Sequence, residues 1–460
     1  RKLAMPDTLI IVASVVLLVA ILSWIIPSGT YDYQEMNING RIRNVAIDGT
    51  YHTIDKSEVT TTGFLGFFSV LYRGCVEAAD VIFMILCCCG TFGVVVKTGA
   101  FHAGIGTILK KLKGKEILLV PIIMLIFGLG GSVFGMASEF YGFYPLIVGL
   151  GVALGYDAMF GFAIIAVGEF VGFMGATLNP YSVGIAQTIS GVELYSGTGY
   201  RTICFVIFMV ISIIYVMMYG RKIKKNPGAS VVFGEKNIHA FDRDELNEYS
   251  FTLKDGLVLL DVLVVLVVLM FGLIKWGWDF PQLCGLFLLM SMIAAAICKW
   301  SPNKWCSEFI DSAKTAMWGC ILTGIAKAIT VVMQDAQIMD TVIYGLSNVL
   351  KNAPHAVSAQ VMLVVQTLIN FFIPSATGQA SATMPIMAQL ADIIGVSRQT
   401  AVLAFQFGDG LSNIFWPTAD IVIICGLGGI SLQKWYKWFT PLFLILFATQ
   451  AILLGIATGI

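Results

Sequence analysis

Ser132-Val-Phe-Gly-Met-Ala-Ser138 recurs later in the chain as Ser375-Ala-Thr-Gly-Gln-Ala-Ser381, with Gly135 and Gly378 243 residues apart. Further pairs of identical residues follow in the same order at nearly the same separation. They are Pro145 with Pro385, Gly155 with Gly395 and Gly168 with Gly408, each 240 residues apart, and upstream Val95 with Val332, 237 apart. Because several matches in one order are not expected by chance, we infer an internal repeat.

The composition indicates the solvent in which this repeat folds. Of 460 residues, 57% are hydrophobic and 12% are charged, and the mean hydropathy is +0.85. A soluble domain carries about 25% charged residues. The chain therefore lacks the polar surface to cover a water-facing body, and a lipid bilayer is the solvent that suits it. The zero net charge gives no indication of a nucleic-acid partner.

The first apolar stretch, from Thr8 to Ile26, is long enough to cross a bilayer, which needs about 20 apolar residues. It is too long for the apolar part of a signal peptide and has no small-residue cleavage site. We expect a retained first membrane helix with Arg1 and Lys2 on the cytoplasmic side. The polar segment from Ile26 to Thr62 is then external, and we expect the last helix, near 438–459, to end outside.

Basic loops set the orientation of the two copies. Lys110, Lys111, Lys113 and Lys115 precede the first copy and mark a cytoplasmic loop. Parity of the predicted crossings places the equivalent loop, 351–356, outside. The two copies are therefore predicted to be inverted, as in many secondary transporters. The predicted organisation is a first helix and external loop (1–62), a first repeat (63–225), a cytoplasmic linker (226–253), connecting helices (254–299) and a second repeat (300–460).

Each copy contains an apolar segment that is interrupted by small and polar residues. The first interruption runs from Gly128 to Glu139, and its counterpart runs from Pro374 to Ser381. We interpret each as the tip of a re-entrant helical hairpin, over 116–155 and 357–397. A pair of full crossings gives the same parity, so the sequence leaves hairpin and full crossing open.

A second interruption lies at Gly168–Pro180 in the first copy and at Gly408–Thr418 in the second. Gly, Asn and Pro in mid-span break the helix and leave backbone groups free, which the membrane tolerates only where protein or a water-filled cavity satisfies them. Half-helix N-termini hold carboxylates, and exposed carbonyls hold Na⁺. The alternative to a binding site is a set of glycine kinks that allow close helix packing. Four breaks at equivalent places favour a binding site.

Three acids, Glu139, Glu169 and Asp409, lie at these breaks, and the last two are equivalent in the repeat. A charge in mid-membrane costs roughly 2.5–3.5 kcal/mol on insertion scales, so such acids usually mark function. No Lys or Arg lies in the same broken segments, which suits a cationic amino group, Na⁺ or a proton. The alternative is that Glu169 and Asp409 stay protonated or hydrogen-bonded to backbone.

The remaining polar groups in apolar segments have more ordinary interpretations. Arg201 and Arg398 lie at predicted helix ends, from which long basic side chains reach the interface. Asp80, Asp157, Asp261 and Asp420 lie near segment ends, and most are expected to be interfacial. The ten cysteines show no metal-binding spacing and behave as small apolar residues. The sequence contains no nucleophile–base pair, so an enzyme is not expected.

The opening Met5-Pro6-Asp7-Thr8, the end of the first helix at Ile25-Ile26-Pro27-Ser28-Gly29-Thr30-Tyr31 and the paired Gly-x-Ala-Ser motifs resemble the YfcC family. That family belongs with the anaerobic dicarboxylate carriers (DcuC-like) of the ion transporter superfamily. The resemblance covers essentially the whole chain. It implies a multi-pass protein of the bacterial cytoplasmic membrane, a scaffold domain with a mobile transport domain, elevator-type movement and a homodimer.

Some similar proteins exchange arginine for ornithine and others carry dicarboxylates. From the acids at the breaks we expect a transporter of amino acids, basic ones in particular, that works by exchange or by coupling to Na⁺ or H⁺, with no cofactor. The alternative is a Na⁺- or H⁺-coupled carrier of dicarboxylates or other small carboxylates. The expected substrate site comprises Ser132, Gly135, Ser138, Glu139, Glu169, Thr177, Asn179, Ser375, Thr377, Gly378, Ser381, Asp409, Ser412 and Asn413, with Na⁺ near Gly131, Asn179, Ser375 or Asn413.

Overall fold

The structure is a computed structural model that describes residues 8–38, 41–112, 116–235, 239, 251–351 and 357–459. Several expectations concern segments outside these residues. They are the opening motif before Thr8, the lysines at 113 and 115, half of the predicted linker 226–253 and the loop 352–356.

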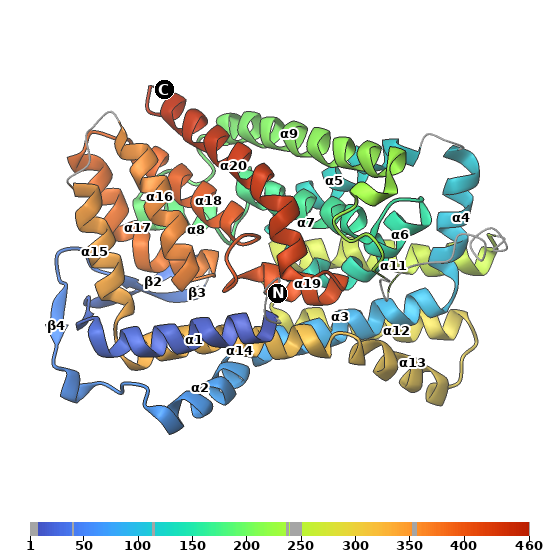
Figure 1. Ribbon diagram of the computed structural model, residues 1–460, viewed down its shortest axis with the longest axis horizontal. Helices are drawn as coiled ribbons and strands as arrows, with labels where there is room; N and C mark the ends of the chain where they lie inside the picture. The colour runs from blue at the N-terminus through green and yellow to red at the C-terminus, as the bar shows by residue number, and fades with distance from the viewer. Residues whose placement is uncertain are drawn as a thin grey trace.

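Helices make up most of the part of the chain that the structure describes (Figure 1). The first part contains α1 (Thr8–Ile25), α2 (Phe64–Glu77), α3 (Ala79–Lys97), α4 (Ala100–Leu112), α5 (Leu119–Leu129), α6 (Tyr144–Ala153), α7 (Ala158–Gly175), α8 (Val183–Ser190) and α9 (Thr198–Lys225). A π-helical turn, η3 (Gly130–Phe134), extends α5, and a 3-10 segment, η4 (Ser138–Phe143), precedes α6. Short 3-10 turns also lie at η1 (Lys56–Glu58), η2 (Glu116–Leu118) and η5 (Pro227–Ala229).

The second part repeats this order of elements. It contains α11 (Leu253–Lys275), α12 (Phe280–Ile297), α13 (Pro302–Lys314), α14 (Met317–Asp335), α15 (Met339–Lys351), α16 (Ser358–Phe372), α17 (Ala376–Ile393), α18 (Arg398–Ser412), α19 (Asp420–Gly428) and α20 (Leu432–Ala457). The two segments with the predicted second interruption are each divided into two helices, α7 with α8 and α18 with α19. The breaks fall in the predicted interruptions.

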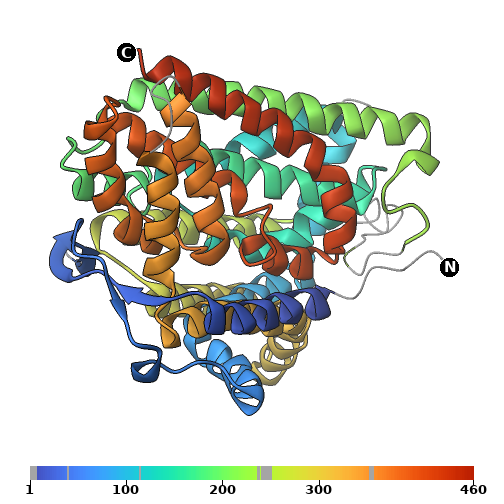
Figure 2. The ribbon, with the colours of Figure 1, turned by 60° about the vertical axis from the view of Figure 1, so that its left-hand side comes forward.

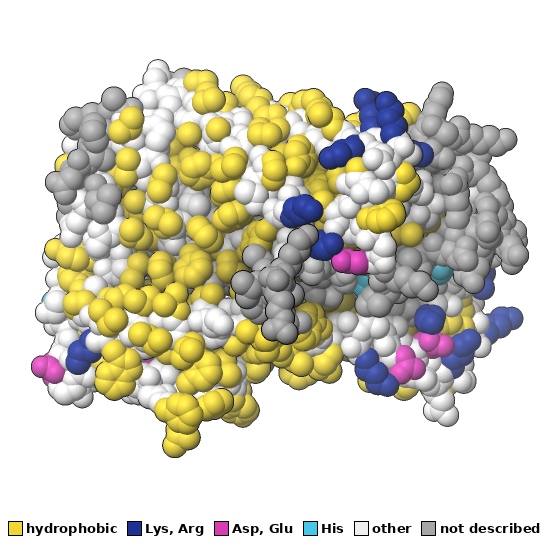
Figure 3. All heavy atoms as spheres, viewed as in Figure 1, with side chains coloured by type: hydrophobic (Ala, Val, Ile, Leu, Met, Phe, Trp, Pro, Cys, Tyr) yellow, Lys and Arg dark blue, Asp and Glu magenta, His cyan; other side chains and the backbone are white. Residues whose placement is uncertain are grey.

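Seven of the described helices are long and apolar enough to cross a membrane: α3, α7, α9, α11, α12, α14 and α20. Apolar side chains cover much of the visible surface between the two ends of the molecule (Figure 3). Such a surface would be unstable in water and is typical of lipid contact. These helices and this surface agree with the prediction of a helical, multi-span membrane protein.

Helices of the first part pack reciprocally against helices of the second. The helix α2 packs on α14 and the corresponding α13 packs on α3, while α8 packs on α17 and the corresponding α19 packs on α6. The helix α1 also packs on α14, as α12 packs on α3, and α7 meets its own counterpart α18. This exchange of partners is the pattern that a two-fold relation between the halves produces. It also makes α12 the counterpart of α1.

The two arms, α4 and α15, lie at opposite ends of the long axis of the molecule and run across it (Figure 1). At the α4 end, Leu119 at the start of α5 lies with Ala153 and Leu154 at the end of α6, against Ile105 of α4. The segment from α5 to α6 therefore starts and finishes at the same end. At the other end, the arm α15 contacts both α16 and α17.

The starts of α16 and α18 lie together beside the C-terminal part of α20. Gln360 Nε2 donates to the carbonyl of Ala451 at 3.2 Å, and Thr400 Oγ1 donates to that of Ala457 at 3.4 Å. Since α18 begins just after α17 ends, the segment from α16 to α17 also returns to the end from which it starts. Figure 2 shows α20 alongside α9 at the edge of the molecule.

The polar segment that was expected as an external loop contains two short antiparallel pairs, β1 (Ser28–Thr30) with β4 (His52–Ile54) and β2 (Tyr33–Ile38) with β3 (Arg41–Ala46). Asp340 at the start of α15 holds them in place, because its carboxylate accepts from the Tyr33 hydroxyl at 2.7 Å and from the Tyr31 amide at 3.0 Å. Burial and the nearby Asp340 carboxylate raise the pKa of Tyr33. The β pairs are thereby fixed to the junction of α14 and α15.

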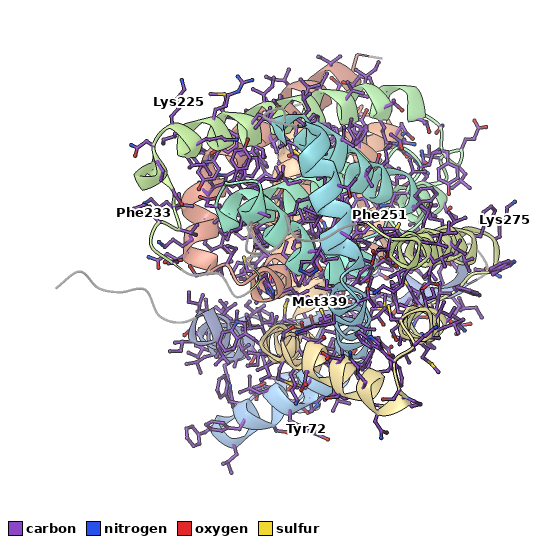
Figure 4. All side chains as sticks on the ribbon, turned by 90° about the vertical axis from the view of Figure 1, so that its right-hand side faces the viewer. Tyr72, Lys225, Phe233, Phe251, Lys275 and Met339 are labelled. Atoms are coloured by element: carbon purple, nitrogen blue, oxygen red, sulfur yellow. The ribbon has the colours of Figure 1, made fainter. Side chains whose placement is uncertain are left out.

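Basic side chains gather at the end of the molecule that contains α4 (Figure 3). They include Arg221, Lys222 and Lys225 at the end of α9, all exposed. Seen from this end, Lys225 and Lys275 project from the rim, and Tyr72 of α2 lies at the lower edge (Figure 4).

Glycines allow the central helices to approach closely. A Cβ on Gly172 of α7 would lie 2.0 Å from the carbonyl oxygen of Gly128 in α5, and one on Gly410 of α18 would lie 2.4 Å from Cα of Met174. No side chain can rotate to relieve such a contact, because the obstacle is backbone. Small residues at these crossings are the means by which membrane helices pack tightly.

We expect Gly172→Ala to lower the thermal unfolding temperature of the purified protein, because the added methyl group forces α5 and α7 apart at a cost of about 1–3 kcal/mol. Gly285→Ala in α12 is the matched control, since its Cβ would have no heavy atom within 4 Å. Alanine favours a helix over glycine, so the control should be neutral or slightly stabilising. Equal unfolding temperatures for the two variants would contradict the packing argument.

Candidate functional site

A cavity of about 530 Å³ lies where the two interrupted segments meet. Ser138 and Tyr141 of η4 line it from the first half. Ser375 and Gly378 at the start of α17 line it from the second half. Further walls come from α14, α19 and the junction of α2 with α3, with Thr323, Lys327, Thr330, Gln334, Thr418, Asp420, Glu77 and Val81 among their lining residues.

Two helix N-termini lie at the wall of this cavity. The π-helical turn η3 ends at Gly135, whose left-handed φ of 68° turns the chain back toward η4. In the second half, Ser375 caps α17 by accepting from the amide of Gly378 at 3.3 Å. The N-terminus of α19 lies on another wall, at Ala419 and Asp420. The positive end of each of these helix dipoles favours an anionic group in the cavity.

The first break lies behind the tip of η3 and is held by short polar contacts. Ser132 Oγ accepts from the amide of Thr177 at 3.1 Å and donates to Thr177 Oγ1 at 3.1 Å. Asn179 Oδ1 accepts from the amide of Tyr181 at 2.9 Å, and its Nδ2 reaches the carbonyl of Gly131 at 3.5 Å. Gly135 packs against Asn179, so a side chain there would collide with it. These predicted residues are brought together, but they fill the break and do not line the cavity.

Arg201 completes this first break, and its placement corrects the expectation of a side chain that reaches the interface. It is 1% exposed. Its guanidinium donates to the carbonyls of Ala176 at 3.0 Å and Thr177 at 3.2 Å, directly after α7 ends. A helix C-terminus inside the membrane leaves carbonyls unpaired, and a buried cation satisfies them in place of water.

The second break contains a cluster of carboxamides around one acid. Asn370 Nδ2 of α16 lies 2.9 Å from Asp409 Oδ1, 3.2 Å from Asn413 Oδ1 and 3.2 Å from Gln379 Oε1. Trp435 of α20 donates its indole N–H to the carbonyl of Ile414 at 2.8 Å, just after α18 ends. Of this cluster, the sequence predicted Asp409 and Asn413 as site residues, while Asn370 and Gln379 were missed.

The acids at the breaks lie deeper than expected. Glu169 and Asp409 are 0% exposed, and neither lines the cavity. Glu169 Oε2 accepts from the hydroxyl of Tyr144 at 2.8 Å. Glu139 turns back to accept from the amide of Ala137 at 3.0 Å.

The charged groups that do line the cavity come from other elements. Asp420 at the start of α19 accepts from the Tyr141 hydroxyl at 2.7 Å, and Glu77 and Lys327 face the same space. Asp420 was expected at an interface, and Lys327 of α14 was not singled out, although a lysine in mid-span was a signal that could have identified it. The cavity wall thus carries two acids and one base.

Three other predicted residues donate hydrogen bonds to backbone carbonyls. Thr377 Oγ1 donates across the halves to the carbonyl of Tyr181 at 2.9 Å. Ser381 and Ser412 donate to carbonyls of their own helices, at Thr377 and Gly408. Of the predicted set, Ser138, Ser375 and Gly378 line the cavity.

Comparison with solved structures finds chains of similar length that align over almost all of this one. The YdaH transporter of Alcanivorax borkumensis covers 99% of this chain and 98% of its own, with 16% identity and a TM-score of 0.44. MtrF of Neisseria gonorrhoeae, from a class of antimetabolite efflux pumps, covers 100% and 96%, with 15% identity and a TM-score of 0.45.

Comparison of sequences is more specific. The Escherichia coli (strain K12) protein named "Putative basic amino acid antiporter YfcC" is 32% identical over 488 aligned residues, covering 98% of this chain and 96% of its own. An uncharacterized protein of Haemophilus influenzae is 27% identical, covering 99% and 97%. The family model described as C4-dicarboxylate anaerobic carrier matches residues 5–459. The resemblance inferred from the motifs is confirmed: the chain is a multi-pass membrane transporter, not an enzyme, and it belongs to the DcuC family.

Proposed function

We propose that the chain is a secondary transporter of amino acids, basic ones in particular, that works by alternating access. The observation that carries the substrate class is the cavity wall. It combines helix N-termini, which favour a carboxylate, with Asp420 and Glu77, which favour an amino group.

The balance of charge supports a cationic substrate. Against the two acids the wall presents one base, Lys327. An α-amino acid places its carboxylate and its amino group on one carbon, so it can meet a helix N-terminus and an acid at the same time. A second cationic group, as in arginine or ornithine, would offset the remaining acid. The name of the Escherichia coli relative points the same way.

The proposed alternating-access mechanism rests on two inverted repeats. Each repeat contains a re-entrant hairpin and a broken helix. The reciprocal packing of α2 on α14 and α13 on α3 supports the two-fold relation. The arms at opposite ends of the molecule support inversion (Figure 1). We assign the basic end with α4 to the cytoplasm, so that the end of α20 is external.

The same contacts support a division into a scaffold domain and a transport domain. We assign α1–α3 and α12–α14 to the scaffold, and α5–α9 with α16–α20 to the transport domain. The arms α4 and α15 connect the two, which suits an elevator-type movement. The proposed homodimer would form through the scaffold.

One observation favours a second candidate, a carrier of dicarboxylates or other small carboxylates. Lys327 faces the cavity together with hydroxyl groups of Ser138, Ser375 and Thr418. The family description names C4-dicarboxylates. In this reading Lys327 binds the substrate, and the acids serve the coupling ion, Na⁺ or H⁺.

Counterflow in proteoliposomes separates the two candidates. Vesicles loaded with ornithine should accumulate labelled arginine, and basic amino acids should compete while dicarboxylates should not. Uptake of a dicarboxylate under a Na⁺ or proton gradient, without arginine exchange, would favour the second candidate.

Variants of the cavity wall give a second measurement. Asp420→Asn should raise the KM for arginine at least about tenfold, since a hydrogen bond to a charged group contributes roughly 1.5–3 kcal/mol. The matched control is Asp311→Asn on α13, whose carboxylate pairs with Lys314 on the exposed surface and should leave exchange unchanged. If Lys327→Met abolishes transport while Asp420→Asn keeps the arginine KM, the amino acid assignment is wrong.

Cysteine labelling checks which predicted residues face the cavity. Ser138→Cys and Ser375→Cys should react with a membrane-impermeant thiol reagent well above the background of the native cysteines, and substrate should slow the reaction. Ser132→Cys, at a 0% exposed position behind the tip, is the control and should stay unreactive. Equal labelling of the three variants would show that the reagent reaches position 132 and would contradict its burial behind the tip.

A further inference from the structure

Two neighbouring helices, α9 and α20, carry several bases near one end and contain no acid. These bases are Arg221, Lys222, Lys224 and Lys225 of α9 and Lys434 and Lys437 of α20. The Tyr215 hydroxyl of α9 donates to the carbonyl of Trp438 in α20 at 2.8 Å, so the two groups of bases lie on adjacent helices (Figure 2). At the opposite end of the pair, Arg201 is buried, and the sequence from Thr440 to Ile460 has no charged residue. The exposed charge of the pair is therefore at one end.

The bases of α9 continue the apolar face that this helix exposes. Exposed apolar side chains recur every three or four residues along it, at Ile203, Val206, Val210, Ile214 and Met218. Arg221, Lys222 and Lys225 follow at the same spacing, are exposed, and Lys225 projects outward (Figure 4). Since residues three or four apart lie on the same face of a helix, the apolar stripe and the bases share one face.

The length of this stripe matches the thickness of a bilayer. Arg221 lies 18 residues beyond Ile203, which is about 27 Å along the helix axis. The hydrocarbon core of a bilayer is about 30 Å thick. With the stripe in the core, the bases therefore lie at the level of the lipid headgroups. Lys437 likewise lies on the face of α20 that exposes Leu444 and Ile452.

The nearby acids already have partners. Asp157 at the start of α7 accepts from the Phe160 amide at 2.7 Å and from the Ser230 hydroxyl at 2.6 Å. Glu235 pairs with Lys434 at 3.1 Å. Within the described part of the chain, no carboxylate forms an ion pair with Arg221, Lys222, Lys225 or Lys437. The exposed face thus presents four positive charges that the protein does not neutralise.

A cavity of about 490 Å³ lies beside the last turn of α9, with Lys224, Tyr156 and Phe233 among its lining residues. Lys224 Nζ lies 4.9 Å from the centre of the Tyr156 ring, and Phe233 is exposed. Aromatic rings next to bases are typical of the membrane–water interface, where one side of the residue meets headgroups and the other meets acyl chains.

We propose that the basic end of α9 and α20 binds an anionic phospholipid, with its phosphate at Arg221, Lys222, Lys225 and Lys437 and its acyl chains along the apolar stripe. Clusters of four or more bases directly beyond a membrane helix attract anionic headgroups. A zwitterionic phospholipid carries a cationic group as well, which the four bases repel. The partner is a lipid and not free phosphate, because the bases and the apolar stripe form one continuous face.

The lipid would bind the part of the chain that we assign to the transport domain, and this consequence alone rests on the proposed function. Movement of that domain along the membrane normal would change the depth of the bases relative to the headgroups. Bound anionic lipid therefore favours the position in which the bases lie at the headgroup level.

Lipid binding is measured on the purified full chain in detergent without substrate, so its outcome is independent of the transport assignment. The unfolding temperature is followed while dioleoyl phosphatidylglycerol or dioleoyl phosphatidylcholine is added, since a ligand that binds the folded state raises it. Phosphatidylglycerol should raise it along a saturable curve, whereas phosphatidylcholine and inorganic phosphate at equal concentrations should not. The variant that combines Arg221→Gln, Lys222→Gln and Lys225→Gln should need at least tenfold more phosphatidylglycerol for half of the shift.

The matched control removes three exposed bases from other helices, by Lys97→Gln, Lys254→Gln and Lys304→Gln. Lys254 and Lys304 lie near Cys298, which contacts Thr98 directly after Lys97, so the three bases lie together. This variant should retain the response of the unmodified chain, because its bases do not belong to the face of α9 and α20.

Lys437→Gln, a single exposed substitution, should also weaken the response and keeps the test decisive if the triple variant of α9 does not fold. The proposal is overturned by equal responses to the two lipids or by an equal shift with inorganic phosphate. It is also overturned if the two triple variants weaken the response equally, or if the variants of α9 and of Lys437 both leave it intact.

Discussion

Backbone groups at the ends of α7 and α18 must find partners inside the membrane, and the rest of the structure depends on how they do so. Each helix stops in the interior, where water is scarce and an unpaired carbonyl is costly. Arg201 of α9 supplies donors to Ala176 and Thr177, and Trp435 of α20 supplies one to Ile414. The long helices that follow the breaks are thus the elements that stabilise them.

This arrangement also explains why the two interrupted segments meet. In each half the interrupted segment is hydrogen-bonded to the broken helix. Ser132 bonds to Thr177 in the first half, and Asn370 bonds to Asp409 in the second. Glycines such as Gly172 allow backbones to approach without an intervening side chain. The space that remains between the tips is the cavity. Helix ends and polar side chains form its walls, because the helices are interrupted at this place.

The two halves share an architecture but not an electrostatic design. Each break has a buried acid with one oxygen that finds no hydrogen-bond partner among the described residues, Glu169 Oε1 in the first and Asp409 Oδ2 in the second, but the first break also contains the guanidinium of Arg201. The β pairs on Asp340 add a further difference, at one arm alone among the described residues.

The sequence by itself determined the membrane class and the positions of the four breaks, and it predicted the repeat. These follow from local signals: apolar length, basic loops, and Gly, Asn and Pro within spans. It also identified Ser138, Ser375 and Gly378, which lie at the tips. Only the tertiary structure placed Asp420, Tyr141 and Lys327 at the cavity, buried Arg201, and gathered Asn370 and Gln379 around Asp409. These residues come from different helices, and no spacing along the chain encodes which faces of those helices meet.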